Sequence, residues 1–195
     1  MKHPPPALEH YCRLVADASL SVTALPDRAA IWRELVEDAL RARPLIGEPL
    51  PELVVDVGSG NGSPGIPLAI DYGRPVTLLE AASRKAAFLR RIVGELGIEA
   101  PVVAERSEHY ARAAGRDRFD LVLARAGGRV VLWTGAVDGD VIDEVAEQLA
   151  ARVSRVEHYG GRRLVEVAKL GATPERFPRR PGMAAKRPLA PLPSR

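Results

Sequence analysis

The sequence predicts an α/β fold: a doubly wound, mostly parallel sheet with an antiparallel C-terminal hairpin, preceded by a helical extension. Three observations predict it. From residue 53 onward, short β-branched runs alternate with helical patterns, which is typical of a parallel sheet with helices on both faces. Before residue 50, apolar residues recur every three to four positions, as on amphipathic helices; in the first helix these are Leu8, Tyr11, Val15 and Ala18. Near the C-terminus, Gly160 and Gly161 separate two extended runs and indicate a hairpin turn.

The chain divides by composition into three parts. Residues 1–50 are expected to form an N-terminal helical extension of two helices, with a break at Pro26-Asp27. Residues 51–172 are expected to form the main domain. Residues 173–195 are a basic, proline-rich tail that cannot form a helix or a central strand. Strands are expected at 53–57, 76–79, 101–104, 119–124, 129–133, 155–159 and 162–168, and helices from Pro64, Ser83, Ser107 and Asp138.

Composition excludes several protein classes. The 195 residues, 46% hydrophobic and 27% charged, fit one soluble domain that is long enough to bury a core. A single cysteine, Cys12, excludes an internally disulfide-bonded secreted scaffold and a zinc finger. No apolar run has the length of a membrane span, and the N-terminus lacks a signal-peptide pattern, so we expect a cytoplasmic protein with no membrane partner. The four histidines have no metal-ligand spacing, and no metal site is expected.

Charge is distributed unevenly along the chain. Residues 1–150 carry 17 basic and 22 acidic side chains, whereas residues 151–195 carry 11 basic and 3 acidic ones. A basic end of this kind can hold a polyanion through phosphate contacts. A solvated, arginine-rich tail explains the same numbers, so charge alone does not decide for nucleic-acid binding.

The strongest local signal is a glycine-rich turn after the first expected strand, in the run Asp56-Val57-Gly58-Ser59-Gly60-Asn61-Gly62-Ser63-Pro64-Gly65. Glycines let the backbone approach a ligand at the carboxyl end of a strand, where open α/β sheets bind ligands. Residues 60–65 formally match a dinucleotide fingerprint, in which a helix N-terminus receives a pyrophosphate. A carboxylate at Asp56 would repel a pyrophosphate but suits the cationic amino group of S-adenosylmethionine. We therefore favour S-adenosylmethionine, bound at Asp56, Gly58, Gly60, Gly62 and Ser63, over a dinucleotide.

Acidic and polar residues follow the next two expected strands. Glu80 ends the second strand, where a carboxylate can accept both hydroxyls of a ribose. Ser107 and Glu108 follow the third strand, where an adenine ring would arrive in the same crevice. The alternative role for these two residues is to cap the helix that they begin.

These motifs lie in a sequence that closely resembles the ribosomal RNA small-subunit methyltransferase G family, also called glucose-inhibited division protein B. The resemblance covers most of the chain. The run Pro64-Gly65-Ile66-Pro67 is more specific to this family than the general methyltransferase signature. The other matching motifs are residues 56–60, 83–89 and 119–126 in the main domain and residues 177–189 in the tail.

The resemblance implies a class I methyltransferase fold, S-adenosylmethionine as methyl donor, and N7 of a guanine in 16S ribosomal RNA as acceptor. It places cofactor contacts at Gly58, Ser63, Ser107 and Glu108, and it places Arg125, the catalytic candidate, where cofactor and substrate meet. Guanine N7 already carries an in-plane lone pair, so transfer needs correct positioning rather than a general base. We expect a monomer that acts on the RNA or on a pre-30S particle.

Basic residues in two places are candidates for RNA contact. Arg84 and Lys85 lie in the first turn of an expected helix, where cations oppose the helix dipole, so a phosphate ligand would explain them. A solvated helix face is the alternative. In the tail, Arg179, Arg180 and Lys186 fit a segment that follows an RNA backbone.

The chain departs from the family after the fourth expected strand. Gly127-Gly128 leads directly into Arg129, where family members have a helix and a further loop. A parallel crossover needs a dozen or more residues, so we expect the fifth strand to pair antiparallel, to leave its usual position or to continue the fourth strand. Because this stretch adjoins the expected acceptor pocket, a shortened paralogue that binds the cofactor or RNA without transferring is an alternative function. A nicotinamide-dependent oxidoreductase is a second alternative, which Asp56 disfavours.

Overall fold

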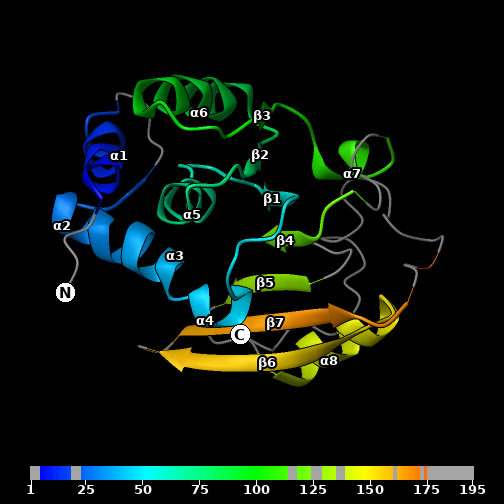
Figure 1. Ribbon diagram of the computed structural model, residues 1–195. Coiled ribbons are helices and arrows are strands. Elements are labelled where there is room, and N and C mark those ends of the chain that lie inside the picture. The colour runs from blue at the N-terminus through cyan, green and yellow to red at the C-terminus, as the bar shows by residue number, and fades with distance from the viewer. Residues whose placement is uncertain are drawn as a thin grey trace. The chain divides into compact units, whose positions relative to one another are not determined.

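The computed structural model describes residues 5–18, 23–113, 118–123, 129–134, 139–159, 162–171 and 174 (Figure 1). Contacts within the chain define two compact units, residues 1–107 and residues 108–195. The division by composition into an extension, a main domain and a tail stays a prediction. Within the described residues, no helix combines the length and the apolar character that crossing a membrane requires.

The N-terminal region is helical, as expected. Its elements are α1 (Pro6–Ala16), α2 (Arg28–Ile31), the π-helix η1 (Trp32–Glu37), α3 (Asp38–Leu40) and α4 (Arg43–Ile46). The Asp27 side chain accepts a hydrogen bond of 2.8 Å from the Ala30 N–H, and this bond caps α2. The second expected helix is therefore continuous through α2, η1 and α3 but contains a wide π turn. Pro44 lies in the first turn of α4, where a proline needs no hydrogen-bond partner.

The first unit contains three parallel strands in the order β3-β2-β1. They are β1 (Val54–Val57), β2 (Thr77–Leu79) and β3 (Val102–Val103), connected through α5 (Gly65–Tyr72) and α6 (Ser83–Leu96). A single turn, α7 (Ser107–Tyr110), follows β3. The parallel pairing brings the carboxyl ends of β1 and β2 side by side, so the turn after β1 lies next to Glu80.

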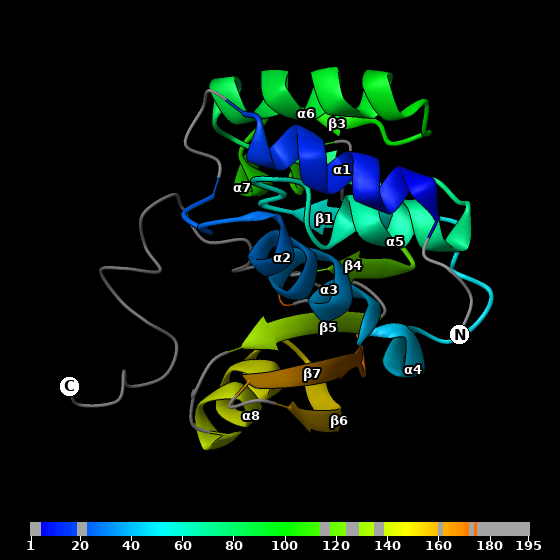
Figure 2. The same ribbon diagram turned by 90° about the vertical axis from the view of Figure 1, so that its left-hand side faces the viewer.

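The core of the first unit includes the N-terminal helices. α1 contacts α5 and α6, and Figure 2 shows it between these two helices. Its apolar stripe is therefore part of the core, as the periodicity predicted. The largest fully buried side chains of this unit are Leu8, Tyr11, Ile31, Leu50, Ile66, Leu68, Leu78, Leu89 and Ile92.

The second unit ends in the expected antiparallel hairpin. Its elements are β4 (Leu121–Leu123), β5 (Arg129–Thr134), α8 (Gly139–Gln148), β6 (Ala151–Tyr159) and β7 (Arg162–Lys169). β6 and β7 pair antiparallel over their length, β5 pairs antiparallel with β7, and α8 contacts β6. The hairpin prediction is confirmed, although Gly160 and Gly161 themselves lie outside the described residues.

The prediction for the fifth strand is wrong. β5 pairs parallel with β4, in the register Leu121↔Arg129 and Val122↔Val130. The prediction assumed a crossover between strands of ordinary length, but β4 has only three residues. The link from Leu123 to Arg129 can reach roughly 20 Å at about 3.5 Å per residue, whereas the return path is only about 8 Å. A helix is therefore not needed to bring β5 back beside β4; the link itself, residues 124–128, lies outside the described residues.

Candidate functional site

The turn after β1 has a fixed backbone shape. The N–H groups of Gly58 and Ser59 both donate to the carbonyl oxygen of Leu79, at 2.7 and 3.2 Å, and the Gly62 N–H donates to the Ser59 carbonyl at 2.6 Å. Gly58, Gly60 and Gly62 have φ values of +79°, +53° and +103°. Residues with a Cβ atom rarely adopt this left-handed backbone conformation, so the turn requires glycine at these positions.

Glu80 ties this turn to the start of α6. Glu80 is 8% exposed; its Oε2 accepts a 2.9 Å hydrogen bond from the Gly60 N–H, and its Oε1 accepts a 2.7 Å bond from the Ala82 N–H. Each carboxylate oxygen has two lone pairs, so Glu80 can hold the turn and still accept hydroxyl groups from a ligand. Its expected role toward a ribose is compatible with these bonds and stays a prediction.

Asp56 is buried at the N-terminus of α5. Its side chain is 2% exposed, and Oδ2 accepts a 3.2 Å hydrogen bond from the N–H of Gly65, the first residue of the helix. Burial, helped slightly by the nearby charge of Glu80, raises the pKa of Asp56 to about 7, against the lowering effect of the hydrogen bonds from Gly65 and Ser59. The positive end of the α5 dipole, where an anion would otherwise bind, thus already faces a carboxylate of the protein.

The turn uses its hydrogen-bond donors internally. A pyrophosphate site needs N–H groups that point at the ligand. Here six N–H groups donate to acceptors of the protein instead: those of Gly58, Ser59, Gly60, Gly62, Ser63 and Gly65. With two buried carboxylates beside it, the turn is suited to a cation rather than to a pyrophosphate.

The glycines of the turn differ in what surrounds them. A Cβ atom built on Gly58 would meet nothing within 4 Å, and one on Gly60 would meet only the Gly58 carbonyl oxygen, at 3.6 Å. A Cβ on Gly62 would lie 2.5 Å from Ile66 Cδ1, and one on Gly65 would lie 2.6 Å from Leu78 Cδ2. The turn therefore has an open side at Gly58 and Gly60, where a ligand can approach the backbone, and a packed side at Gly62 and Gly65.

Two residues that the sequence analysis did not select also contact the turn. The Tyr11 hydroxyl donates to the Asn61 carbonyl at 3.3 Å, and the Ser63 hydroxyl donates to the Leu35 carbonyl at 2.8 Å. Tyr11 was predicted only as a member of the apolar stripe of the first helix. A tyrosine in such a stripe carries a hydroxyl that needs a partner when buried, and this was the available signal.

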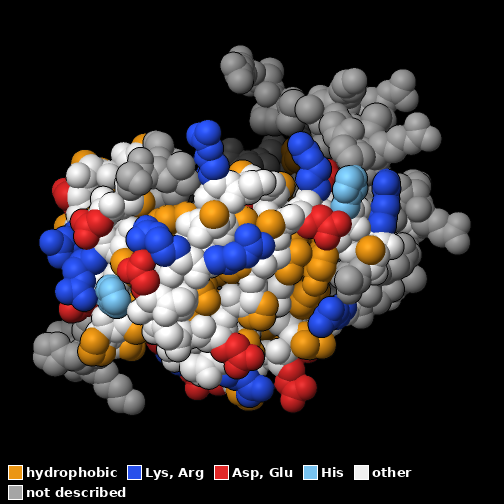
Figure 3. Space-filling view, turned by 90° about the horizontal axis from the view of Figure 1, so that it is seen from above, with side chains coloured by type: hydrophobic (Ala, Val, Ile, Leu, Met, Phe, Trp, Pro, Cys, Tyr) orange, Lys and Arg blue, Asp and Glu red, His pale blue; other side chains and the backbone are white. Residues whose placement is uncertain are grey.

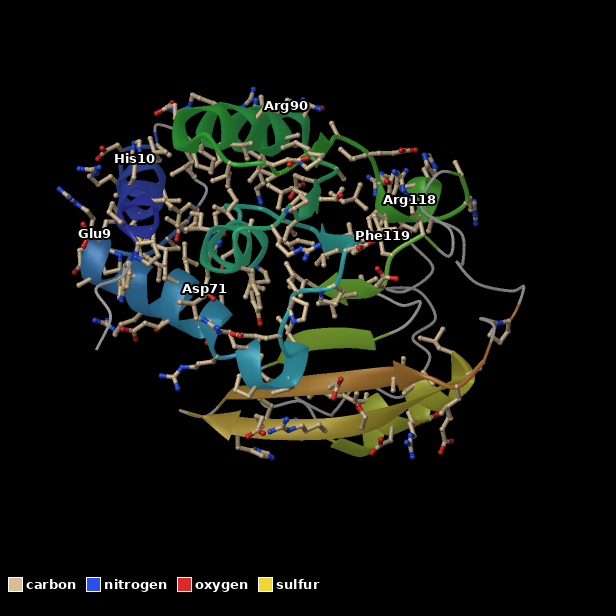
Figure 4. All side chains as sticks on the ribbon, in the orientation of Figure 1. Glu9, His10, Asp71, Arg90, Arg118 and Phe119 are labelled. Carbon is tan, nitrogen blue, oxygen red and sulfur yellow. The ribbon has the colours of Figure 1, made fainter. Side chains whose placement is uncertain are left out.

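The remaining predicted site residues have different positions. Ser107 and Glu108 begin α7, the next helix after β3, and both are half-buried. Arg84 is exposed and Lys85 half-buried in the first turn of α6, whose outward side also carries Arg90 (Figure 4). Arg125, Arg179, Arg180 and Lys186 lie outside the described residues. Among the residues that the structure describes, no three His, Cys, Asp or Glu side chains form a group that could hold a metal ion.

Replacing Gly65 with alanine should destabilise the protein by about 2 kcal/mol, because the new Cβ would lie 2.9 Å from Asp56 Oδ2 as well as against Leu78. Gly94→Ala is the matched control: it lies inside α6, a Cβ there meets nothing within 4 Å, and it should stabilise by up to about 1 kcal/mol. Urea unfolding of both variants measures the difference. Equal effects would contradict the packed environment assigned to Gly65.

Asp56→Asn should change how stability depends on pH. Because the pKa of Asp56 is raised to about 7 in the folded protein, its contribution to stability is greatest at low pH and is lost as pH rises toward 7. Asparagine does not titrate and can still accept the Gly65 N–H. Unfolding free energies of both proteins at pH 5 and pH 8 should show the variant gaining about 2 kcal/mol relative to the parent at the higher pH. A difference that does not vary with pH would contradict a raised pKa.

Comparisons with known proteins identify the family of the chain. The family model described as rRNA small subunit methyltransferase G matches residues 6–137. Curated relatives named ribosomal RNA small subunit methyltransferase G include one from Chloroflexus aggregans, 36% identical over 87% of this chain and 82% of its own, and one from Moorella thermoacetica, 32% identical over 93% and 89%.

Solved structures with the same fold are more distant in sequence. A mutant of MtNAS in complex with S-adenosylmethionine superposes with a TM-score of 0.58 at 18% identity, covering 85% of this chain and 73% of its own. The 16S rRNA methylase RmtB gives a TM-score of 0.54 at 13% identity, covering 87% and 76%. The expected class I methyltransferase fold is thereby confirmed. The family model matches more than half of this chain. The chain therefore belongs to the rRNA small subunit methyltransferase G family.

Proposed function

We propose that this protein transfers a methyl group from S-adenosylmethionine to N7 of a guanine in 16S ribosomal RNA. The family supplies the reaction class and the RNA substrate. The structural observation that carries the proposal is the turn after β1: its N–H groups are used within the protein, and two buried carboxylates adjoin it. That arrangement favours a cationic cofactor over a dinucleotide.

The residues of the turn fit this cofactor in charge and in space. S-Adenosylmethionine, when bound, supplies a methyl group on a positively charged sulfonium centre, next to a cationic amino group. Asp56 would offset that positive charge, and Glu80 would accept hydroxyl groups of the ribose. The open side of the turn at Gly58 and Gly60 leaves room for the ligand against the backbone. Gly62, Ser63, Ser107 and Glu108 complete the proposed cofactor set, and Arg125 is the proposed catalytic residue.

The substrate side of the proposal rests on charge and on the chemistry of guanine. N7 needs no deprotonation before it reacts. The protein therefore has to hold the base in line with the methyl group of the cofactor and to exclude other geometries. Arg84 and Lys85 on α6, with Arg179, Arg180 and Lys186, are the proposed phosphate contacts. On the face seen in Figure 3, Lys and Arg side chains are interspersed with Asp and Glu, so local contacts rather than a continuous basic band would position the RNA. We further propose that the protein acts as a cytoplasmic monomer, on the RNA or on a pre-30S particle.

A second candidate function keeps binding but not transfer. The link between β4 and β5, residues 124–128, has only five residues and includes Arg125, and this favours a shortened paralogue that binds the cofactor or RNA only. Binding of S-adenosylmethionine without methyl transfer to either RNA or particles would select this candidate. Binding of a nicotinamide dinucleotide instead would contradict both.

Titration calorimetry of S-adenosylmethionine, followed by transfer of a labelled methyl group to 16S RNA, tests the proposal. Asp56→Asn should weaken cofactor binding at pH 8 by roughly tenfold, since a charge-assisted contact is lost. Asp71→Asn is the matched control, because Asp71 lies near the other end of α5 and pairs with Arg43 (Figure 4). In the parent protein, the affinity for S-adenosylmethionine should rise from pH 6 to pH 8 as Asp56 ionises. Equal affinity of the two variants would overturn the assignment of Asp56.

Replacing Arg84 and Lys85 together with alanine should weaken RNA binding and reduce the slope of log K against log salt by about 1 to 2, while cofactor affinity stays unchanged. Arg90→Ala with Arg91→Ala is the matched control, with the same loss of charge on the same helix. Filter binding at several salt concentrations measures both slopes. The same reduction in both double variants would mean that these cations act through general charge and not through contacts at the helix start.

A further inference from the structure

The N-terminal helices reach the proposed cofactor turn through two hydrogen bonds. The Tyr11 hydroxyl of α1 donates to the Asn61 carbonyl, and the Leu35 carbonyl of η1 accepts from the Ser63 hydroxyl. These bonds join residues 50 and 28 positions apart in the chain. They fall on either side of Gly62, so both act on the same short piece of backbone.

Tyr11 is placed to act on the turn from inside the core. Its side chain is 0% exposed, whereas its neighbour Glu9 points outward from α1 (Figure 4). Burial raises the pKa of Tyr11 well above its ordinary value, and the nearby Cys12 and Asp56 raise it further, so the hydroxyl stays a neutral donor. Because the hydroxyl is fully buried, it affects the ligand only through Asn61.

The second bond comes from the wide turn of the N-terminal region. Leu35 lies within η1, and π turns interrupt the regular ladder of backbone hydrogen bonds in a helix. The Leu35 carbonyl accepts a side-chain hydroxyl from the turn at 2.8 Å, a short and well-formed bond. Ser63 is thereby held from the side of η1, while its own N–H is held by the Asn61 side chain at 3.1 Å.

The same backbone is held from the other side by α5. The Gly62 carbonyl accepts a 2.7 Å hydrogen bond from the Ile66 N–H, and a Cβ on Gly62 would lie 2.5 Å from Ile66 Cδ1. Residues 61–63 are thus fixed between the N-terminal helices and α5. Gly58 and Gly60, a few residues earlier, form the open side of the turn.

We propose that Tyr11 and the Leu35 carbonyl are positioning groups that hold the turn in its ligand-binding shape, so that α1 and η1 form part of the cofactor site. The inference rests on the proposed function for the identity of the ligand. Its statement about the shape of the turn concerns the protein alone and can be tested without a ligand.

Hydrogen exchange of Tyr11→Phe gives that ligand-independent test. We expect the amides of residues 58–65 to exchange at least about fivefold faster in this variant. Tyr72→Phe is the matched control, because the Tyr72 hydroxyl donates in the same way to a backbone carbonyl, that of Gly47, at 2.9 Å and away from the turn. Unchanged exchange over residues 58–65 in Tyr11→Phe, or equal acceleration in both variants, would overturn the inference.

Cofactor affinity gives the second test. Tyr11→Phe should weaken S-adenosylmethionine binding by roughly five- to tenfold at unchanged stoichiometry, and KM for the cofactor should rise while kcat at saturation is kept. Ser63→Ala should weaken binding similarly, the double variant should lose less than the product of the two effects, and Ser63→Thr should restore binding. A reduced stoichiometry with unchanged affinity would mean partial unfolding and would overturn the inference. If the parent protein binds no S-adenosylmethionine, the proposed function fails, and the exchange comparison still decides the role of Tyr11.

Discussion

The buried contact between the Asp56 carboxylate and the N-terminus of α5 is the constraint on which the rest of the site depends. The contact requires the helix to start close to β1, and only a residue without a side chain at Gly65 permits that approach, since a Cβ there would lie 2.9 Å from Asp56 Oδ2. The contact also costs stability, because a carboxylate is desolvated near a second acidic group, Glu80. In return, a carboxylate of the protein occupies the helix N-terminus, and its charge suits the proposed cationic cofactor.

The order of the elements could be predicted because its signals are local. Period-2 and period-3.6 patterns, the glycine pair at the hairpin and the proline break at residue 26 each act within a few positions of the structure they specify. The pairing of β5 could not be predicted in the same way. It depends on β4 being only three residues long, and the apolar run at residues 119–124 gives no sign of where hydrogen bonding stops.

The candidate site was likewise predictable where its signals are local in the sequence. Asp56, Glu80 and the glycines stand out because their residue types are unusual at the end of a buried strand, and the structure brings all of them to one turn. The contacts from α1 and η1 were not predictable, because the acceptors are the backbone carbonyls of Asn61 and Leu35, which every residue type carries. Tyr11 and Asn61 lie 50 positions apart in the chain, so only the folded structure shows that they are in contact.

If the proposed cofactor binds at this turn, stability and ligand binding are linked through the same two carboxylates. Without a cation beside it, Asp56 is held in a desolvated place near Glu80, and its raised pKa is the sign of that unfavourable environment. A cation bound there would favour the ionised form and lower the same pKa, so binding would offset part of the free energy that the folded protein loses by ionising Asp56. Ligand binding at the proposed site would therefore stabilise the first unit in proportion to its affinity, which already includes the contact with Asp56. The hydrogen bonds from Tyr11 and to Leu35 fit this account, because they fix the backbone of the turn without adding charge to it.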